Sequence, residues 1–403
     1  MDYGWLTFWG PSVECLTISP VDPQRLWFGT SGHVFGTVNG GDSWQQCYCE
    51  TFPDGRFRGN GLEVTCLFSI VPDPHRPGRV FFCFYDIGLL VSEDGGQTFR
   101  RLSKGMEHSG NCFTIVTEPD NPDRLWACTG EWGRNVGDVC RSDDAGETWR
   151  VVGRPETGLP VGQTKTLLLD RASPSDRRRL LVTCQGHGIF ESLDGGESWH
   201  SINGNLPDRV AQNPRGLLMN PSDPLHLIAA FGGSPAEGAG VYETRDGGKT
   251  WQKISDVEDL ADIQCLAASP FDFRTLYIAQ REFYDRAVEP PVMRPGGLFV
   301  SHDGGRTWRR IFGDYSFVQC VVPSPAAPNV IYIGTTDHPY HDRPLGVGVL
   351  KSEDGGASWR LENRGLTCLN VSCMAVDPTD PSRLFVGTGG NGAFVGVDPA
   401  VKH

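Results

Sequence analysis

Residues 301–308 read Ser-His-Asp-Gly-Gly-Arg-Thr-Trp, and close variants of this phrase return about every fifty residues along the chain. There are seven copies, whose final aromatic residues are Trp44, Phe99, Trp149, Trp199, Trp251, Trp308 and Trp359. The Asp can fold its carboxylate onto nearby backbone N–H groups, the glycines permit positive φ, and the aromatic residue packs back on the sheet. The phrase therefore predicts a tight turn between two strands, and its period predicts one supersecondary unit stacked repeatedly.

The strands expected before each turn phrase allow the units to be counted. A first-strand position recurs eight times, at Cys15, Cys66, Cys112, Thr166, Gly216, Cys265, Cys320 and Cys373. The last unit has strands expected at 371–376, 384–388 and 393–397 but no turn phrase, and residues 5–9 can supply its missing fourth strand. Such closure removes exposed sheet edges. We predict an all-β chain in which residues 1–403 form a single eight-bladed β-propeller, with seven blades as the alternative.

Composition and charge limit the kinds of partner that the chain is expected to bind. It has 403 residues, 51 Gly, 29 Pro and a net charge of −13, which suits a turn-rich β protein and argues against a general hold on nucleic acid or an anionic membrane. No apolar stretch reaches about eighteen residues, and residues 1–11 lack the pattern of a secretion signal. We therefore expect a cytoplasmic protein. The basic run at residues 177–179 is expected to be a solvated turn.

The thirteen cysteines predict a reduced protein rather than a disulfide framework. Many of them recur at equivalent positions of the repeat, where a small apolar side chain fills the core. The sequence has no Cys-x-x-Cys or Cys/His ligand spacing, and the turn phrase lacks the alternating ligands and closing Glu of a calcium loop. We expect no metal and no cofactor.

Loop lengths distinguish the two faces that a propeller would have. The turn phrase is nearly fixed, whereas the connection from the second to the third strand varies between 8 (Gly29 to Thr37) and 22 residues (Ala279 to Ser301). Binding and catalytic groups are usually mounted on loops of this kind above a rigid scaffold. The function is therefore expected on the variable face, opposite the turn phrases.

The variable loops contain carboxylates, imidazoles, arginines and aromatic residues that suit a sugar or a uronate. The predicted catalytic residues are Asp86, Glu131, His187 and Asp337. The predicted substrate-binding residues are Trp132, Arg134, Arg281, Tyr284, His338, Tyr340, His341 and Arg56. Three alternatives stay open: Asp337 can cap a turn, His187 can be a structural residue, and His338 with His341 can be surface residues or metal ligands.

The turn phrases resemble the Asp-box, or BNR, repeat, and the stretch before each one is similar to the repeat of xyloglucan-active glycoside hydrolases and of photosystem II assembly factor-like propellers. The segment 85–88, Tyr-Asp-Ile-Gly, resembles the Asp-x-Gly segment that carries a catalytic carboxylate in the hydrolases. Those enzymes contain two tandem propellers with the cleft between them, so Asp86 would need a different partner, such as Glu131 or Asp337. The resemblance implies the propeller fold but no single activity.

Two functional hypotheses follow. The first is a cytoplasmic carbohydrate-active enzyme, of glycoside hydrolase or uronate lyase type, that acts on an oligosaccharide or another polar small molecule at the variable face. The second is a non-catalytic propeller that uses the same rim to bind a protein partner in an assembly role.

Overall fold

The computed structural model describes residues 12–30, 33–61, 65–131, 133–255, 259–315, 317–337 and 346–398. These residues form eight antiparallel sheets of three or four strands, together with two separate two-stranded hairpins. The helical turns among them are η1 (Pro155–Thr157), α2 (Asp208–Ala211) and η2 (Pro235–Glu237). The all-β prediction is confirmed.

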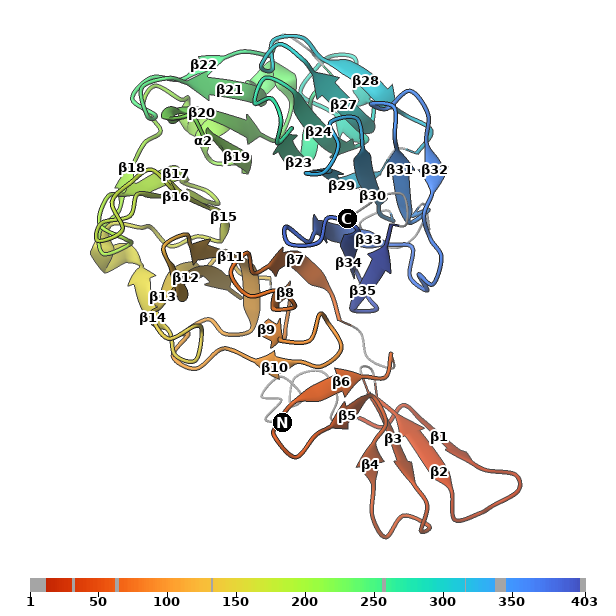
Figure 1. The fold of residues 1–403 in the computed structure, drawn as a ribbon. Coiled ribbons are helices and arrows are strands. Elements are labelled where there is room, and N and C mark those ends of the chain that lie inside the picture. The colour runs from red at the N-terminus through yellow and green to blue at the C-terminus, as the bar shows by residue number, and fades with distance from the viewer. Residues whose placement is uncertain are drawn as a thin grey trace.

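Seven of the sheets stand around a central channel, and each has its first strand innermost (Figure 1). We name each sheet by this innermost strand. The innermost strands are β7 (Leu67–Pro72), β11 (Asn111–Glu118), β15 (Thr164–Leu169), β19 (Pro214–Asn220), β23 (Asp262–Ala268), β29 (Val318–Pro323) and β33 (Val371–Val376). The second strands are β8 (Val80–Phe84), β12 (Asn121–Gly130), β16 (Leu180–Cys184), β20 (Asp223–Phe231), β24 (Leu276–Arg281), β30 (Ile331–Thr335) and β34 (Arg383–Thr388).

The outer strands complete the sheets. The third strands are β9 (Gly88–Ser92), β13 (Gly137–Ser142), β17 (Gly188–Ser192), β21 (Gly240–Thr244), β27 (Gly297–Ser301), β31 (Val349–Ser352) and β35 (Ala393–Val397). The fourth strands are β10 (Arg100–Arg101), β14 (Arg150–Gly153), β18 (His200–Ser201), β22 (Gln252–Lys253), β28 (Arg309–Phe312) and β32 (Arg360–Leu361). Buried apolar clusters fill the spaces between neighbouring sheets, so both faces of most ring sheets are covered.

The ring closes where the last sheet meets the β7 sheet. Leu67 lies in one buried apolar cluster with Cys373 and Phe385 of the β33 sheet. The guanidinium of Arg383 donates a hydrogen bond of 3.1 Å to the carbonyl oxygen of Gly95. Seven sheets are therefore enough to close the channel.

The first sheet lies beside the ring rather than in it (Figure 1). Its strands are β1 (Cys15–Ile18), β2 (Leu26–Gly29), β3 (Val34–Thr37) and β4 (Gln45–Gln46). Leu16 of β1 is 60% exposed, whereas Leu67 of β7 is fully buried. The eight-bladed ring is consequently not confirmed, because in the described part of the chain seven sheets surround the channel and the sheet of β1 lies outside it. The predicted closing strand at residues 5–9 lies outside the described residues.

A hairpin joins the first sheet to the ring. It consists of β5 (Cys49–Thr51) and β6 (Phe57–Gly59). Phe57 exchanges two backbone hydrogen bonds with Phe99, of 2.9 and 2.8 Å, at the outer edge of the β7 sheet. This pairing takes up the long connection between the first two repeats.

The register of the innermost strands corrects two of the predicted repeat positions. Cys265, Cys320 and Cys373 pair with Ala279, Gly334 and Gly387 at the same point of their sheets. In the β7 and β11 sheets the equivalent residues are Ser69 and Thr114, which face Cys83 and Cys128. Cys66 and Cys112 therefore lie earlier in the repeat than the sequence suggests. None of the thirteen cysteines, all of which lie in the described ranges, forms a disulfide.

The turn phrase folds as its residue types predict. In the copy that ends at Trp308, the Asp303 carboxylate accepts hydrogen bonds from the Thr307 amide at 2.9 Å and from the Thr307 hydroxyl at 2.6 Å. The Ser301 hydroxyl accepts one from the Gly305 amide at 2.8 Å, and the indole N–H of Trp308 donates to the Gly305 carbonyl at 2.8 Å. The Asp303 carboxylate is thus occupied by hydrogen bonds within its own turn.

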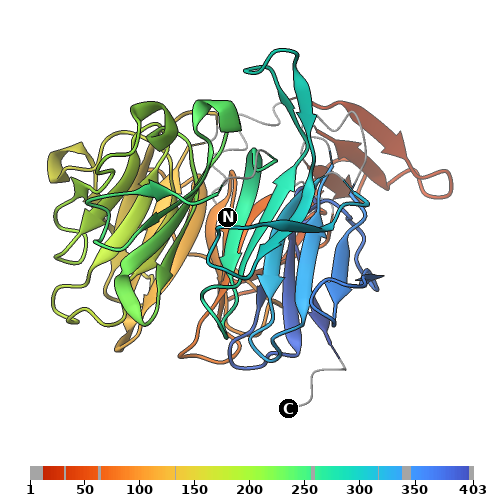
Figure 2. The same ribbon diagram turned by 90° about the horizontal axis from the view of Figure 1, so that it is seen from above.

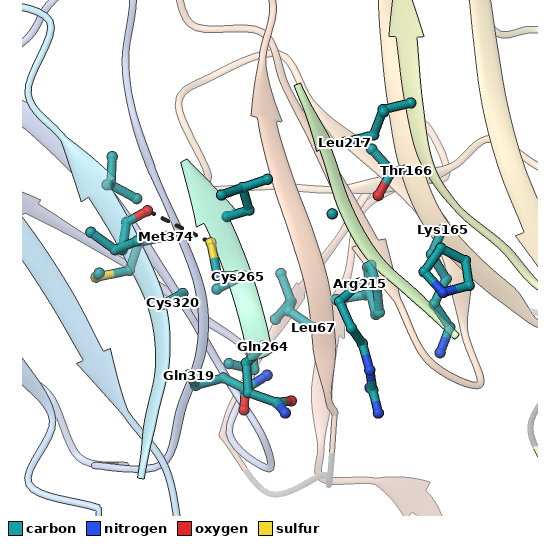
Figure 3. A pocket seen from close by; sticks show the side chains of 18 of the residues that line it. Leu67, Lys165, Thr166, Arg215, Leu217, Gln264, Cys265, Gln319, Cys320 and Met374 are labelled. Atoms are coloured by element: carbon teal, nitrogen blue, oxygen red, sulfur yellow. Dashed lines mark hydrogen bonds between the residues drawn. The ribbon is translucent and has the colours of Figure 1, made fainter. Parts of the chain in front are cut away.

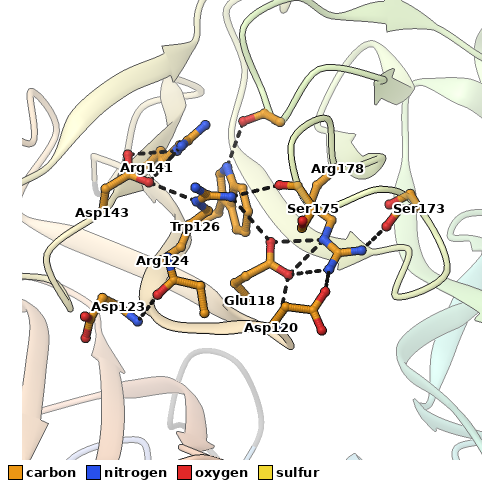
Figure 4. Close-up of polar contacts among 12 residues, drawn as sticks. Glu118, Asp120, Asp123, Arg124, Trp126, Arg141, Asp143, Ser173, Ser175 and Arg178 are labelled. Carbon is orange, nitrogen blue, oxygen red and sulfur yellow. Dashed lines mark hydrogen bonds and ion pairs between the residues drawn. The ribbon is translucent and has the colours of Figure 1, made fainter.

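The basic run at residues 177–179 is not the solvated turn that was expected. Arg178 is buried and forms an ion pair with Glu118, at 2.6 Å, that connects the β11 and β15 sheets (Figure 4). Arg179 is also buried, and its Nε lies 2.5 Å from a carboxylate oxygen of Glu191. This polar turn is anchored because each of the two cations has a buried carboxylate as its partner, Glu118 for Arg178 and Glu191 for Arg179.

Candidate functional site

The connections between second and third strands lie on one face of the ring, as do the segments that join successive sheets. The longest described connection contains the hairpin of β25 (Phe283–Asp285) and β26 (Val292–Arg294). This hairpin stands out from the ring in Figure 2. The predicted difference between a fixed and an elaborated face is therefore visible in the fold, and we call the elaborated face the rim.

Asp86 lies on the rim in the turn between β8 and β9. Its backbone φ is +69°, a left-handed conformation that is uncommon outside glycine, and its amide donates to the side-chain oxygen of Asn111 at 2.7 Å. Burial raises the pKa of the Asp86 carboxyl. A carboxyl that keeps its proton to higher pH is suited to act as a general acid.

Glu131 follows β12 on the neighbouring sheet and has the opposite electrostatic environment. Its carboxylate contacts Nδ1 of His108 at 2.9 Å and a guanidinium nitrogen of Arg134 at 2.6 Å. Burial acts to raise the pKa of Glu131, but the hydrogen bonds from His108 and Arg134 outweigh it, so the pKa lies below the ordinary value. Glu131 is therefore a charged carboxylate held in place by two partners.

Asp86, through its backbone amide, and Glu131, through its carboxylate, both contact the same short segment, residues 108–111, that enters β11. Asp86 contacts this segment at Asn111, and Glu131 contacts it at His108. Two of the four predicted catalytic residues therefore lie on loops that contact one common segment, and the pKa values of their carboxyl groups are shifted in opposite directions.

The sequence interpretation missed two residues beside Glu131. Nε2 of His108 lies 3.5 Å from a carboxylate oxygen of Asp138, which is buried at the start of β13. Burial raises the pKa of Asp138, and the same oxygen has no hydrogen-bond partner among the described residues. A signal did exist: the residue after the glycine that opens the third strand is apolar in the other sheets, as at Leu89, Ile189, Val241, Leu298 and Val349. Asp138 is the polar exception.

The other two predicted catalytic residues have structural partners. Nε2 of His187 lies 3.0 Å from the carbonyl oxygen of Val161, which assigns the proton to Nε2. The Asp337 carboxylate accepts a hydrogen bond of 2.8 Å from the amide of Gly346 and so spans the base of the longest loop in the last four-stranded sheet. Among the described residues, neither the His187 nor the Asp337 side chain makes a hydrogen bond or an ion pair with the 108–111 segment.

The predicted substrate-binding residues are dispersed. Arg281 pairs with Asp262 at 3.1 Å, and Tyr284 on the β25–β26 hairpin has Arg286 above its ring at 5.4 Å. Arg56 lies away from the rim, because its guanidinium contacts Asp54 at 2.7 Å and the hydroxyl of Thr98 in a turn phrase at 3.1 Å. Four predicted residues lie outside the described ranges, namely Trp132, His338, Tyr340 and His341.

The central channel contains a cavity of about 420 Å³. Apolar side chains such as Leu67, Leu217 and Met374 form its wall, and the polar ends of Lys165 and Arg215 lie together at one end with Gln264 and Gln319 (Figure 3). Tyr85, next to Asp86, also lines this cavity. The polar end therefore belongs to the rim side of the ring.

Two features of the described residues concern metal ions and membranes. In the described ranges, no group of three or more His, Cys, Asp or Glu side chains is arranged to hold a metal ion. The same ranges contain no helix long and apolar enough to cross a membrane.

The fold and its turns define the chain as an Asp-box β-propeller, which confirms the predicted resemblance. The BNR/Asp-box repeat family matches residues 242–253 and 299–310. Among curated proteins, a xyloglucanase of Paenibacillus sp is 26% identical over 413 residues, which span 96% of this chain and 33% of that protein. An oligoxyloglucan-reducing end-specific xyloglucanase of Emericella nidulans is 23% identical and covers 80% of this chain and 43% of its own length. The chain thus spans less than half of these relatives.

Solved structures show the same fold. The GH74 enzyme of Niastella koreensis superposes with a TM-score of 0.63 at 19% identity, over 82% of this chain and 52% of that one. YCF48 from Cyanidioschyzon merolae superposes with a TM-score of 0.58 at 15% identity, over 83% of this chain and 96% of that one. One of these proteins is an enzyme by name and the other is not, so the likeness concerns the fold.

Proposed function

We propose that the chain is a carbohydrate-active hydrolase unit that binds an oligosaccharide on the rim and cleaves it with Asp86 and Glu131. The observation that carries the proposal is the opposite pKa shift of these two carboxyl groups on adjacent loops. Pairs of carboxyl groups whose environments separate their pKa values provide the acid and the base of glycoside hydrolysis. The similarity to xyloglucanases along most of this chain supports the same class of substrate.

In the proposed reaction, Asp86 gives its proton to the oxygen of the leaving sugar as the glycosidic C–O bond breaks. Water adds to the anomeric carbon, and Glu131 takes the proton that the water releases. His108 and Arg134 keep Glu131 ionised before this step. Thirteen cysteines without a disulfide among them fit a reducing compartment, so we also propose that the reaction takes place in the cytoplasm.

The test is turnover of a panel of neutral xyloglucan oligosaccharides and uronate-containing oligosaccharides, with products identified by mass. Hydrolysis adds one water per cleaved bond, whereas a lyase reaction gives an unsaturated product without added water. We expect Asp86→Asn and Glu131→Gln each to lower kcat about 100-fold or more. Asp176→Asn, an exposed residue in a turn of the opposite face, is the matched control and should retain full activity.

The pH profile gives a second readout. Because Asp86 must be protonated, turnover should fall as pH rises through its elevated pKa, and this limb should disappear in Asp86→Asn. Absence of turnover on the whole panel, or an Asp86→Asn variant as active as Asp176→Asn, would refute the proposal. The former result together with capture of a protein by the rim would favour the protein-binding hypothesis.

A further inference from the structure

The seven innermost strands share a β-bulge near the start of each strand. In every one of them the register with the second strand slips there by one residue. The bulged residues are Phe68, Phe113, Lys165 with Thr166, Arg215, Gln264, Gln319 and Ser372. All of these except Phe113 line the channel cavity. Bulges redirect side chains, and here they turn one side chain of nearly every sheet into the channel.

The ring of bulged residues is chemically asymmetric. The β7 sheet supplies Phe68, whereas the bulged Phe113 of the β11 sheet is buried in the core between sheets. The next two sheets supply Lys165 and Arg215, the following two supply Gln264 and Gln319, and the last supplies Ser372. If the bulges served only to curve the sheets, the repeat would not require this order. A grouped sequence of aromatic, cationic and amide side chains instead matches the parts of one ligand that is not symmetric.

The cationic sector lacks a full set of counter-charges. The Lys165 ammonium makes no hydrogen bond or ion pair with any described residue, and its Nζ lies 5.9 Å from the centroid of the Phe113 ring. Arg215 reaches Asp262 only at 3.8 Å, and its buried Nε has no hydrogen-bond partner in the described ranges. Asp262 is closer to Arg281, at 3.1 Å. No Asp or Glu is among the described residues that line the cavity.

The placement of the Lys165 and Arg215 cations near each other is electrostatically unfavourable without a counter-ion. Burial lowers the pKa of Lys165, and the neighbouring Arg215 lowers it further. Burial likewise lowers the pKa of Arg215, against the opposing effect of Asp262. Two neighbouring cations in a partly buried channel, where the Arg215 side chain is 33% exposed, are stabilised by an anion placed between them, and a carboxylate or phosphate is the group that their N–H donors fit.

The rest of the cavity selects among anions. Phe68 and Tyr85 form an edge-to-face pair at 5.5 Å on the wall, and the side-chain amides of Gln264 and Gln319 lie beside Arg215 at the polar end (Figure 3). An aromatic wall accepts the apolar face of a sugar ring, and amides can bond to hydroxyl groups in either direction. A volume of about 420 Å³ admits a small molecule but not a folded partner.

We infer that the channel is a binding site for a sugar acid, a hydroxyl-rich ring that carries one carboxylate, with the carboxylate between Lys165 and Arg215 and the hydroxyls toward Gln264 and Gln319. The site is distinct from the Asp86 and Glu131 pair and does not depend on the proposed hydrolysis, since no reaction takes place in it.

The test measures binding by calorimetry and by the shift in Tm for the full chain. The probes are glucuronate, glucose as the uncharged control, acetate as the carboxylate without hydroxyls, and inorganic phosphate. We expect glucuronate to bind at least about tenfold more tightly than each of the other three. Equal binding of glucose, equal binding of acetate or phosphate, or no binding of glucuronate would overturn the inference.

Variants of Lys165 and Arg215 test the contribution of the two cations to glucuronate binding. Lys165→Met and Arg215→Met should each weaken glucuronate binding about tenfold or more while leaving glucose binding unchanged. Arg209→Met, on an exposed turn of the rim, is the matched control, and Arg215→Lys retains the charge if Arg215→Met does not fold. If neither Lys165→Met nor any foldable Arg215 variant alters glucuronate affinity, the carboxylate does not lie where we infer. Loss of turnover with intact glucuronate binding, or the reverse, distinguishes this site from the hydrolytic one.

Discussion

The buried ion pair between Glu118 and Arg178 gives a prediction whose size follows from the structure. Arg178 is 2% exposed and Glu118 is fully buried at the end of β11. Nε of Arg178 donates to both carboxylate oxygens of Glu118, at 2.8 and 3.0 Å, and another nitrogen of the guanidinium contacts Asp120 (Figure 4). The pair joins two neighbouring sheets, so it acts on the stability of the ring.

Arg178→Met should destabilise the chain by about 3–5 kcal/mol, because it leaves the Glu118 carboxylate buried without its main partner. Glu118→Gln should cost less, about 1–3 kcal/mol, since Asp120 still balances the charge of Arg178. The double variant should cost at least about 1 kcal/mol less than the sum of the single variants, because neither charge is then stranded. These values are a large part of a typical free energy of unfolding of about 5–15 kcal/mol.

The assay is urea denaturation followed by tryptophan fluorescence. Arg150→Met provides the matched control, because Arg150 pairs with Glu197 between two neighbouring sheets in the same way but with both side chains about half exposed. That variant should lose no more than about 1 kcal/mol. Equal losses for Arg178→Met and Arg150→Met would show that burial does not set the strength of these pairs, and additive single and double variants would show that the two charges are not coupled.

Two further predictions concern acid and thiols. Hydrogen bonds from Thr250 and Ser358 lower the pKa of Asp246 and of Asp354, in each case to about 2. Since an unfolded Asp titrates near about 3.9, the stabilisation is complete above that pH and is lost as the pH falls toward 2; a urea midpoint that stays constant between pH 5 and pH 2 would contradict this. Burial raises the pKa of Cys184 to about 12, so iodoacetamide at pH 8 should label exposed Cys15 and leave Cys184 unmodified until urea unfolds the chain. Mass mapping of the labelled peptides checks this, and equal labelling of both in the native protein would refute it.

Local structure could be predicted well from the repeat. The strands expected at 371–376 and 393–397 have these bounds in the structure, because each is fixed by its own turn residues and its own apolar pattern. The number of sheets in the ring could not be predicted, because the first repeat has the same local signals as the others. The position of the first sheet beside the ring depends on the long connection whose Phe57 pairs with the outer edge of the β7 sheet. The strand pattern of the sequence does not indicate this pairing.

The site was predicted only in part, for a related reason. Asp86 and Glu131 could be proposed from the sequence because they stand in loops, where a polar residue has no obvious structural role. Lys165 and Arg215 stand inside strands, where polar residues normally face solvent, and only the bulges turn them into the channel. The sequence did contain a signal for these residues: a polar residue recurs immediately before each first-strand position of the repeat, as at Gln264 and Gln319.

The contact between Arg383 and Gly95, which closes the ring, spans 288 positions of the chain. During synthesis at about 5–20 residues per second, one face of the β7 sheet therefore waits uncovered until residues of the β33 sheet have emerged from the ribosome. The intermediate sheets can stack on one another in order as they appear, because each meets its predecessor within about fifty residues. Completion is different, since it needs the two ends of the stack to meet across the whole length of the ring, and contacts this distant in sequence form slowly. The closing seam is thus the last part of the ring to become native and the part whose apolar surface stays exposed longest.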